Sequence, residues 1–117
     1  MKKAYVYILS NKYRTTFYIG VTSQIKRRIL EHKNGEGSEF TSKYNLTDLV
    51  YYEKIEGIDE CIAREKQLKN WHRTWKIDLI KGDNPTMIDL AANWYEKKNG
   101  TWMVKSYSLG DPESSSG

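Results

Sequence analysis

The sequence has little of what disulfide-bonded, zinc-binding or membrane-spanning proteins depend on. Cys61 is the only cysteine, which excludes an internal disulfide, and with only His32 and His72 beside it no closed tetrahedral zinc site can form within the chain. No run of about eighteen apolar residues occurs. The first residues form a strand pattern rather than the apolar core of a signal peptide. We therefore expect a soluble cytoplasmic protein with no membrane partner.

What is present is aromatic and basic. The 117 residues are enough for one domain with one core. Of these residues, 38% are hydrophobic and 13% are aromatic, and they include nine tyrosines and four tryptophans. The net charge is +4, and residues 1–81 hold 16 Lys and Arg against 10 Asp and Glu, whereas residues 82–117 hold 3 against 5. A basic domain suits the phosphate backbone of nucleic acids, although a surplus of this size is common in ordinary proteins.

Two short segments rich in β-branched and aromatic residues, 4–9 and 16–21, predict a β-hairpin. Pairing Tyr7 with Tyr18 would leave one face of this hairpin wholly apolar, because side chains alternate between faces. The other face would carry hydroxyl groups in its middle and a residue without a side chain at its edge: Tyr5, Tyr7, Thr16, Tyr18 and Gly20.

The other elements are predicted from helical spacing, turn residues and capping signals. They are helices at 23–33, 59–70 and 72–81, a strand at 47–55, and a short fourth helix at 86–95. Thr22 or Ser23 would cap the first helix. We place one domain at 1–96 and a flexible C-terminal tail at 97–117.

Three polar side chains occur on or beside helix faces that otherwise carry apolar residues. Arg28 and His32 are four residues apart at the edge of the apolar stripe of the first helix. An arginine with a buried stem and a histidine bonded to a neighbour would explain them without any function. Glu65 falls within the apolar stripe of the second helix, where a carboxylate needs a cation or a metal. A structural ion pair with Arg28 and a role in a site both fit, and one shared cleft would satisfy all these groups.

In order and spacing, these residues resemble the core of the GIY-YIG nucleases. Tyr5-Val6-Tyr7, ten intervening residues, Tyr18-Ile19-Gly20, Val21-Thr22-Ser23 and the helix from Ile25 to His32 carry the resemblance, with Tyr5 standing where the name motif has glycine. The stretch from Ala63 to Lys69 and the Asn84-Pro85 pair resemble the small single-domain bacterial branch, related to the nuclease domain of excision repair. The resemblance spans residues 3–95.

The resemblance implies an α/β fold of the α+β kind, a three-stranded antiparallel sheet flanked by helices, and metal-dependent hydrolysis of DNA. By position, it implies that the catalytic residues are Tyr7, Tyr18, Arg28 and His32, and that Glu65 binds one divalent cation, Mg²⁺ or Mn²⁺. Tyr7 would act as general base with help from His32 and Tyr18, and Arg28 would hold the scissile phosphate. Asn84 is a further match to a family asparagine.

The expected partner is DNA, with branched and single-stranded DNA among the possible forms. We assign contacts with DNA to four basic residues: Lys26, Arg27, Lys66 and Lys69. Two other functions fit the sequence. A catalytically silent nucleic-acid-binding module of the same fold would bind DNA in a salt-sensitive manner without cutting it. An interaction protein could dock a partner through its tryptophans, Trp71, Trp75, Trp94 and Trp102, although their helical spacing is more typical of residues that cap a core. The oligomeric state cannot be read from the sequence.

Overall fold

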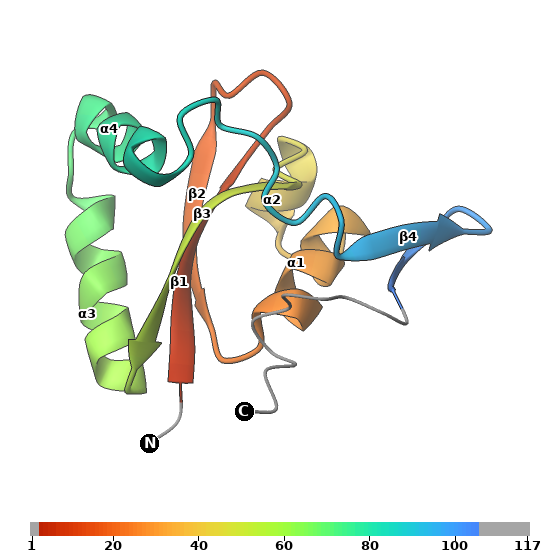
Figure 1. Ribbon diagram of the computed structural model, residues 1–117, viewed down its shortest axis with the longest axis horizontal. Helices are drawn as coiled ribbons and strands as arrows, with labels where there is room; N and C mark the ends of the chain where they lie inside the picture. Colours follow the sequence, from red (N-terminus) through yellow and green to blue (C-terminus); the bar gives the residue numbers. More distant parts are fainter. Residues whose placement is uncertain (1–2, 106–117) are drawn as a thin grey trace.

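A computed structural model describes residues 3–105, and its centre is a three-stranded antiparallel sheet (Figure 1). The strand order is β2-β1-β3, with β1 at Lys3–Ser10, β2 at Phe17–Thr22 and β3 at Asp48–Glu56. The helices are α1 (Ile25–Lys33), α2 (Glu39–Lys43), α3 (Ile58–Lys69) and α4 (Arg73–Asp83), and a second sheet pairs β4 (Tyr95–Lys98) with β5 (Thr101–Val104). The predicted sheet flanked by helices is confirmed. Among the described residues, no helix is both long and apolar enough to cross a membrane.

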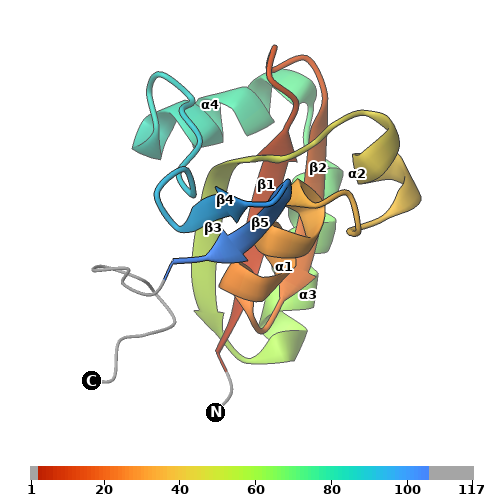
Figure 2. The ribbon, with the colours of Figure 1, turned by 90° about the vertical axis from the view of Figure 1, so that its right-hand side faces the viewer.

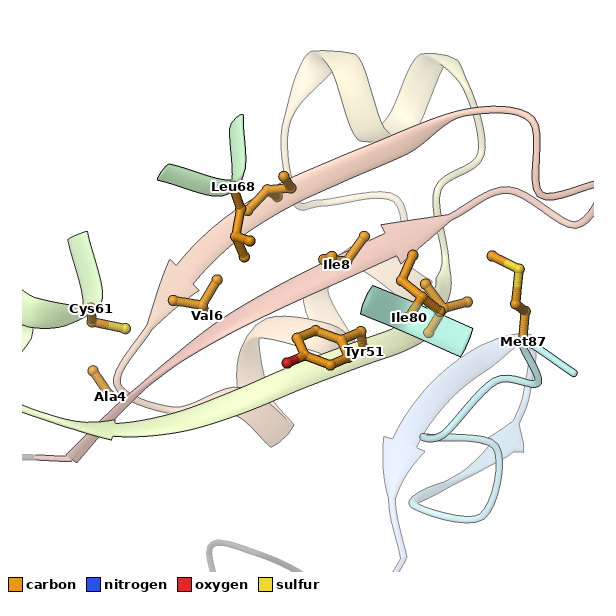
Figure 3. Close-up of a cluster of buried hydrophobic side chains, with 10 residues drawn as sticks. Ala4, Val6, Ile8, Tyr51, Cys61, Leu68, Ile80 and Met87 are labelled. Atoms are coloured by element: carbon orange, nitrogen blue, oxygen red, sulfur yellow. The ribbon is translucent and has the colours of Figure 1, made fainter. Parts of the chain in front are cut away.

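Helices cover both faces of the sheet (Figure 1, Figure 2). A separate hydrophobic cluster therefore lies on each side of it. One cluster joins β1 to α3 and α4, and Figure 3 shows part of it: Ala4, Val6, Ile8, Cys61, Leu68 and Ile80. The other joins β1 to α1: Tyr5, Tyr7, Leu9, Ile25 and Ile29. The alternation of side chains along β1 therefore puts its tyrosines on the α1 side, as a period of two predicts.

The register of the β1–β2 hairpin differs by two residues from the predicted one. Tyr7 lies opposite Gly20, and Tyr18 lies opposite Leu9, so the predicted pairing of Tyr7 with Tyr18 is wrong. A shift of two residues keeps each side chain on its predicted face. The physical reason for the observed register is steric, because a Cβ atom opposite Tyr7, at position 20, would lie 2.5 Å from the hydroxyl oxygen of Tyr7. Only glycine leaves room for that ring.

Residues 86–95 do not form the predicted fourth helix, and their main elements are turns before β4 begins at Tyr95. Asn84 holds the start of this segment: its Nδ2 donates to the backbone oxygens of Val50 and Ile88, and its Oδ1 accepts from the Ile88 N–H. Asp89 holds the next part by accepting from the Leu49 N–H at 3.0 Å. Side chains thus bind backbone groups here and compete with a helix.

The hairpin of β4 and β5 crosses the predicted domain boundary at residue 96. Its turn contains Asn99 and Gly100, both with positive φ, which is the signature of a two-residue hairpin turn. Asn34 joins the hairpin to the end of α1, because its Nδ2 donates to the Trp102 backbone oxygen and its Oδ1 accepts from the Trp102 N–H. The structured domain therefore continues through residue 104, which corrects the predicted tail. The rest of that tail, residues 106–117, lies outside the described residues.

Candidate active site

Side chains from three elements gather around Tyr7. Tyr7 projects from the middle of β1 and is 1% exposed. The Nε2 atom of His32 lies 3.1 Å from the Tyr7 hydroxyl, and the Nε of Arg28 donates to it at 3.4 Å. Arg28 and His32 reach the same atom because residues four apart lie one above the other on a helix. Tyr18, from β2, completes the group, with ring centroids 6.4 Å from Tyr7 and 5.9 Å from His32.

Two glycines allow these rings to lie against the backbone. A Cβ atom at Gly20 would come within 3.0 Å of the Tyr18 ring as well as overlapping Tyr7, and a Cβ atom at Gly37 would overlap the imidazole of His32. A side chain at either glycine would therefore displace the neighbouring ring. Gly20 belongs to the motif that the sequence analysis recognised. Gly37 lies between the predicted helix at 23–33 and the predicted strand at 47–55, and no local signal ties it to His32.

Thr41 holds the other side of the His32 ring and was not singled out from the sequence. Its Oγ1 lies 3.1 Å from the Nδ1 of His32 and accepts from the Ser38 N–H, also at 3.1 Å. Ser38 and Thr41 form a capping box at the start of α2, in which Thr41 is the third helical residue. This short Ser-x-x-Thr pattern was the only signal available in the sequence. It places a hydroxyl group at the one nitrogen of His32 that Tyr7 does not use.

Burial makes His32 a neutral residue. The side chain is 2% exposed, and burial, with a smaller contribution from the Arg28 charge, lowers the pKa of the imidazole to about 4. A neutral imidazole has one N–H donor and one nitrogen acceptor. At neutral pH His32 therefore links Tyr7 and Thr41, donating on one side and accepting on the other.

Tyr7 is a protonated phenol in the free protein. Burial raises its pKa to about 12, the hydrogen bond from Arg28 opposes this rise, and the nearby Tyr18 and Glu65 add to it. The observed contacts of Tyr7 come from α1 and β2, and Glu65 on α3 acts on Tyr7 as one cause of its raised pKa.

Glu65 lies at the border of the core rather than at the centre of an apolar stripe. On α3, Cys61 and Leu68 are fully buried, whereas Ile58 and Ile62 are 47% and 38% exposed, so the predicted stripe is only partly buried. The Glu65 side chain is 20% exposed, and its Oε2 lies 3.3 Å from the Nζ of Lys69.

The structural alternative, a Glu65–Arg28 ion pair, is not what the described chain shows, because Arg28 pairs with Glu31 at 2.8 Å instead. Both charged residues therefore take their ion partners from their own helices.

The Glu65 carboxylate suits a hard cation better than a zinc ion. Within residues 3–105, three or more His, Cys, Asp or Glu side chains nowhere gather closely enough to hold a metal. Mg²⁺ does not need such a group, because it keeps water molecules and binds through one or two carboxylates together with substrate oxygens. Glu65 is partly exposed, and its partner Lys69 is a half-exposed side chain that can move away. The donor chemistry is therefore compatible with one Mg²⁺ or Mn²⁺ ion.

Comparison with known proteins identifies the family of this chain. Residues 3–78 match the GIY-YIG catalytic domain. The chain belongs to the GIY-YIG family. Its relatives include a UPF0213 protein of Staphylococcus saprophyticus, 35% identical over 80 residues that make up 68% of this chain and 96% of that protein. Another is a UPF0213 protein of Syntrophus aciditrophicus, 37% identical over 86 residues, 73% of this chain and 97% of the relative.

A solution NMR structure of the UPF0213 protein BH0048 from Bacillus halodurans is also similar, with 28% identity and a TM-score of 0.48 over 72% of this chain and 88% of that one. The match to the GIY-YIG domain ends at residue 78, within α4. The β4–β5 hairpin therefore lies beyond the matched GIY-YIG region, although it packs on α1 of that region through Asn34.

The basic residues predicted to contact DNA differ in their exposure on this GIY-YIG domain. The side chains of Arg27 and Lys69 are 72% and 52% exposed, and Lys66 is exposed as well. Lys26 is buried, with 6% exposure, because the first turn of α1 directs it into the protein. Lys26 therefore has no solvent-facing surface for a nucleic acid, which corrects its predicted role.

Asn84 does not join the Tyr7 cluster of the GIY-YIG domain. It is 4% exposed, and its amide group is used by the backbone of Val50 and Ile88. Its position at the C-terminal end of α4 gives it a structural role. The predicted site role of Asn84 is therefore corrected to a structural one.

Proposed function

We propose that this GIY-YIG domain is a metal-dependent endonuclease that hydrolyses phosphodiester bonds in DNA. The observation that carries the proposal is the convergence of His32 and Arg28 on the buried hydroxyl of Tyr7. A hydrophobic core does not need a phenol, a guanidinium and a neutral imidazole in one network, and such a network is costly to bury. Proton transfer beside an anionic phosphate can use all three groups.

Tyr7 is the proposed general base, and His32 is the group that accepts its proton. The Oγ1 of Thr41 accepts from the Ser38 N–H and lies 2.9 Å from Ser38 Oγ, to which its hydroxyl can donate, so its remaining lone pair can accept from His32 Nδ1. That tautomer leaves Nε2 free to accept the Tyr7 proton. The phenolate would then remove a proton from the attacking water.

Arg28 connects substrate binding to this proton transfer. Its charge is one of the causes of the low His32 pKa. A phosphate bound to the guanidinium would offset that charge, and the His32 pKa would rise towards the range in which the imidazole can accept a proton. Glu31 now occupies one side of the guanidinium, and the Gly37 backbone oxygen accepts from another nitrogen at 3.3 Å, so a phosphate would compete with Glu31 for Arg28.

Glu65 is the proposed ligand for one divalent cation, with water and phosphate oxygens completing its shell. When bound, Mg²⁺ or Mn²⁺ would neutralise charge on the phosphate and on the leaving oxygen. In the free protein the Glu65 carboxylate raises the Tyr7 pKa, so neutralising it would also ease the loss of the Tyr7 proton.

The test is cleavage of supercoiled, branched and single-stranded DNA with Mg²⁺, Mn²⁺ or a chelator. We expect cutting only with metal, no cutting by Glu65→Gln, and a loss of at least about 100-fold in Tyr7→Phe. Tyr13→Phe is the matched control, because Tyr13 is 78% exposed and outside the cluster. A Tyr7→Phe protein that cuts at the wild-type rate would refute the role of Tyr7. DNA binding without any cutting would instead support the silent binding module.

A further inference from the structure

Helix α2 exposes two aromatic rings beside the Tyr7 cluster. Phe40 and Tyr44 are 45% and 43% exposed, and their ring centroids are 4.9 Å apart. Phe40 also lies 6.3 Å from Tyr18, whose ring is 5.9 Å from His32. The aromatic surface formed by Phe40 and Tyr44 therefore continues from the candidate active site out to solvent. Exposed large apolar side chains that gather at one place call for an explanation, whereas scattered ones do not.

The aromatic surface is held in place independently of these two rings. Ser38 Oγ accepts from the Thr41 N–H at the start of α2, and Thr41 is bonded to the buried His32. At the other end of the helix, the N–H of the fully buried Leu46 donates to the Thr41 backbone oxygen at 2.9 Å. Thr41 therefore anchors α2 from both sides. Phe40 and Tyr44 remain available for a contact with another molecule.

A nucleobase is the ligand that best fits this surface. The Lys43 ammonium lies 5.3 Å from the centroid of the Tyr44 ring, so a cation suited to phosphate stands beside a ring face suited to a base. Aromatic rings next to cations bind bases by stacking in proteins that hold single strands. Two rings are too small an area for a stable protein interface. The faces of a paired base are covered by its neighbours in the duplex, so the base must be unpaired or flipped out.

We propose that Phe40 and Tyr44 stack one unpaired base of the bound DNA strand, next to the phosphate held by Arg28, while Lys43 contacts the adjoining phosphate. This subsite rests on the proposed nuclease function, and it adds a specific prediction to it. DNA with an unpaired base near the cleaved bond gains a contact that a fully paired duplex lacks.

Binding in the presence of a chelator tests this subsite apart from cleavage. The probes are oligonucleotides that carry the fluorescent base 2-aminopurine at one position in a single strand, in a duplex where it is unpaired, and in a fully paired duplex. We expect quenching on binding of the first two. Phe40→Leu and Tyr44→Leu should each weaken these two complexes about tenfold and reduce the quenching, and Phe40→Tyr should retain both. Affinity for the paired duplex should not change.

Trp75→Leu is the matched control, because Trp75 is a 53% exposed ring on α4, away from α2 in both views (Figure 1, Figure 2). Unchanged affinity and quenching in both leucine variants on α2 would overturn the subsite, even if wild-type protein binds and cuts DNA. So would an equal loss in Trp75→Leu. Binding and quenching without metal-dependent cleavage would support the subsite and refute the nuclease. The absence of binding to every oligonucleotide would refute both.

Discussion

At the scale of single residues, a missing side chain shapes the candidate site as much as those that are present. Gly20→Ala would place a methyl group 2.5 Å from the Tyr7 hydroxyl, and Tyr7 is only 1% exposed. We expect cleavage to fall by about 100-fold, because the reacting groups lose their alignment, and the melting temperature to fall as well. Cleavage kinetics and thermal unfolding measure the two effects.

The control for this substitution is Gly82→Ala on α4. A Cβ atom there would meet nothing within 4 Å, and Gly82 lies within the helix. Alanine should therefore stabilise the protein by up to about 1 kcal/mol and leave cleavage unchanged. If Gly20→Ala behaved like Gly82→Ala, the close packing of Tyr7 on Gly20 would not matter for function.

His32 makes stability depend on pH. The folded protein holds its pKa at about 4, below the ordinary value of 6.5, so between these values the unfolded chain binds a proton that the folded chain does not. The contribution of the neutral imidazole is complete above the ordinary pKa and is lost as the pH falls towards 4. We expect the free energy of unfolding to drop by about 2 kcal/mol more in the wild type than in His32→Gln between pH 7 and pH 5.

Urea unfolding at the two pH values measures this difference. His72→Gln is the control, because His72 is an exposed histidine at the start of α4. Equal pH dependence in wild type and His32→Gln would show that the burial of His32 has no effect on its titration.

Thr41 acts as a positioning residue if it fixes the tautomer of His32. Thr41→Val keeps the shape of the side chain but removes the acceptor at 3.1 Å from Nδ1. We expect kcat to fall about tenfold with KM unchanged, and the pH profile of kcat to shift, because partners that orient a histidine typically contribute this much. Thr41→Ser should restore both. A loss of stability with an unchanged kcat profile would reduce Thr41 to a helix cap.

Several residues of this cluster could be predicted because their positions follow from local periods. A period of two put Tyr7 and Tyr18 on one face of the hairpin even though the register was off, and helical spacing put Arg28 and His32 on one edge of α1. Thr41 could not be found in this way. Its contact with His32 depends on how the chain returns after α1, and a capping box of Ser and Thr carries no information about that path.

At the scale of elements, α2 and the β4–β5 hairpin were not predicted, for different reasons. The five residues of α2 are too few to show a helical period, and a helix this short exists only where caps and packing hold it. The hairpin did carry a signal, since Asn99-Gly100 is a strong turn pair. The flanking segments Tyr95–Lys98 and Thr101–Val104 have only four residues each, too few for clear alternation.

The link between α1 and this hairpin can be tested through Asn34. Its side chain makes two hydrogen bonds to the backbone of Trp102, at 3.1 and 3.0 Å. Asn34→Ala would remove both, so we expect a loss of about 1–2 kcal/mol in the free energy of unfolding. Asn93→Ala, at an exposed position in the preceding turn, should have little effect. Equal stability of the two variants would mean that the hairpin does not stabilise the domain.

At the scale of the whole molecule, the three-stranded sheet was predictable because each strand has its own pattern, whereas the path after α4 was not. Residues 86–95 have the composition of a short helix, but Asp89 is bound by residues that are distant in sequence. Its carboxylate accepts from the Leu49 N–H and pairs with Lys33 of α1 at 2.8 Å. These contacts lie 40 or more residues apart in sequence, so no local pattern predicts them.

The charge distribution over the whole surface predicts how DNA binding responds to salt. Each phosphate contact that is lost should reduce the slope of log K against log salt concentration by about 0.7–0.9. We expect that change for Arg27→Gln and for Lys66→Gln, whose side chains are exposed on α1 and α3. Lys98→Gln removes the same charge from β4, where the side chain is 61% exposed, and should leave the slope unchanged. Fluorescence anisotropy in chelator, over a range of salt concentrations, measures all three slopes. An equal slope change in Lys98→Gln would mean that net charge controls affinity, and not local contacts of Arg27 and Lys66 with DNA.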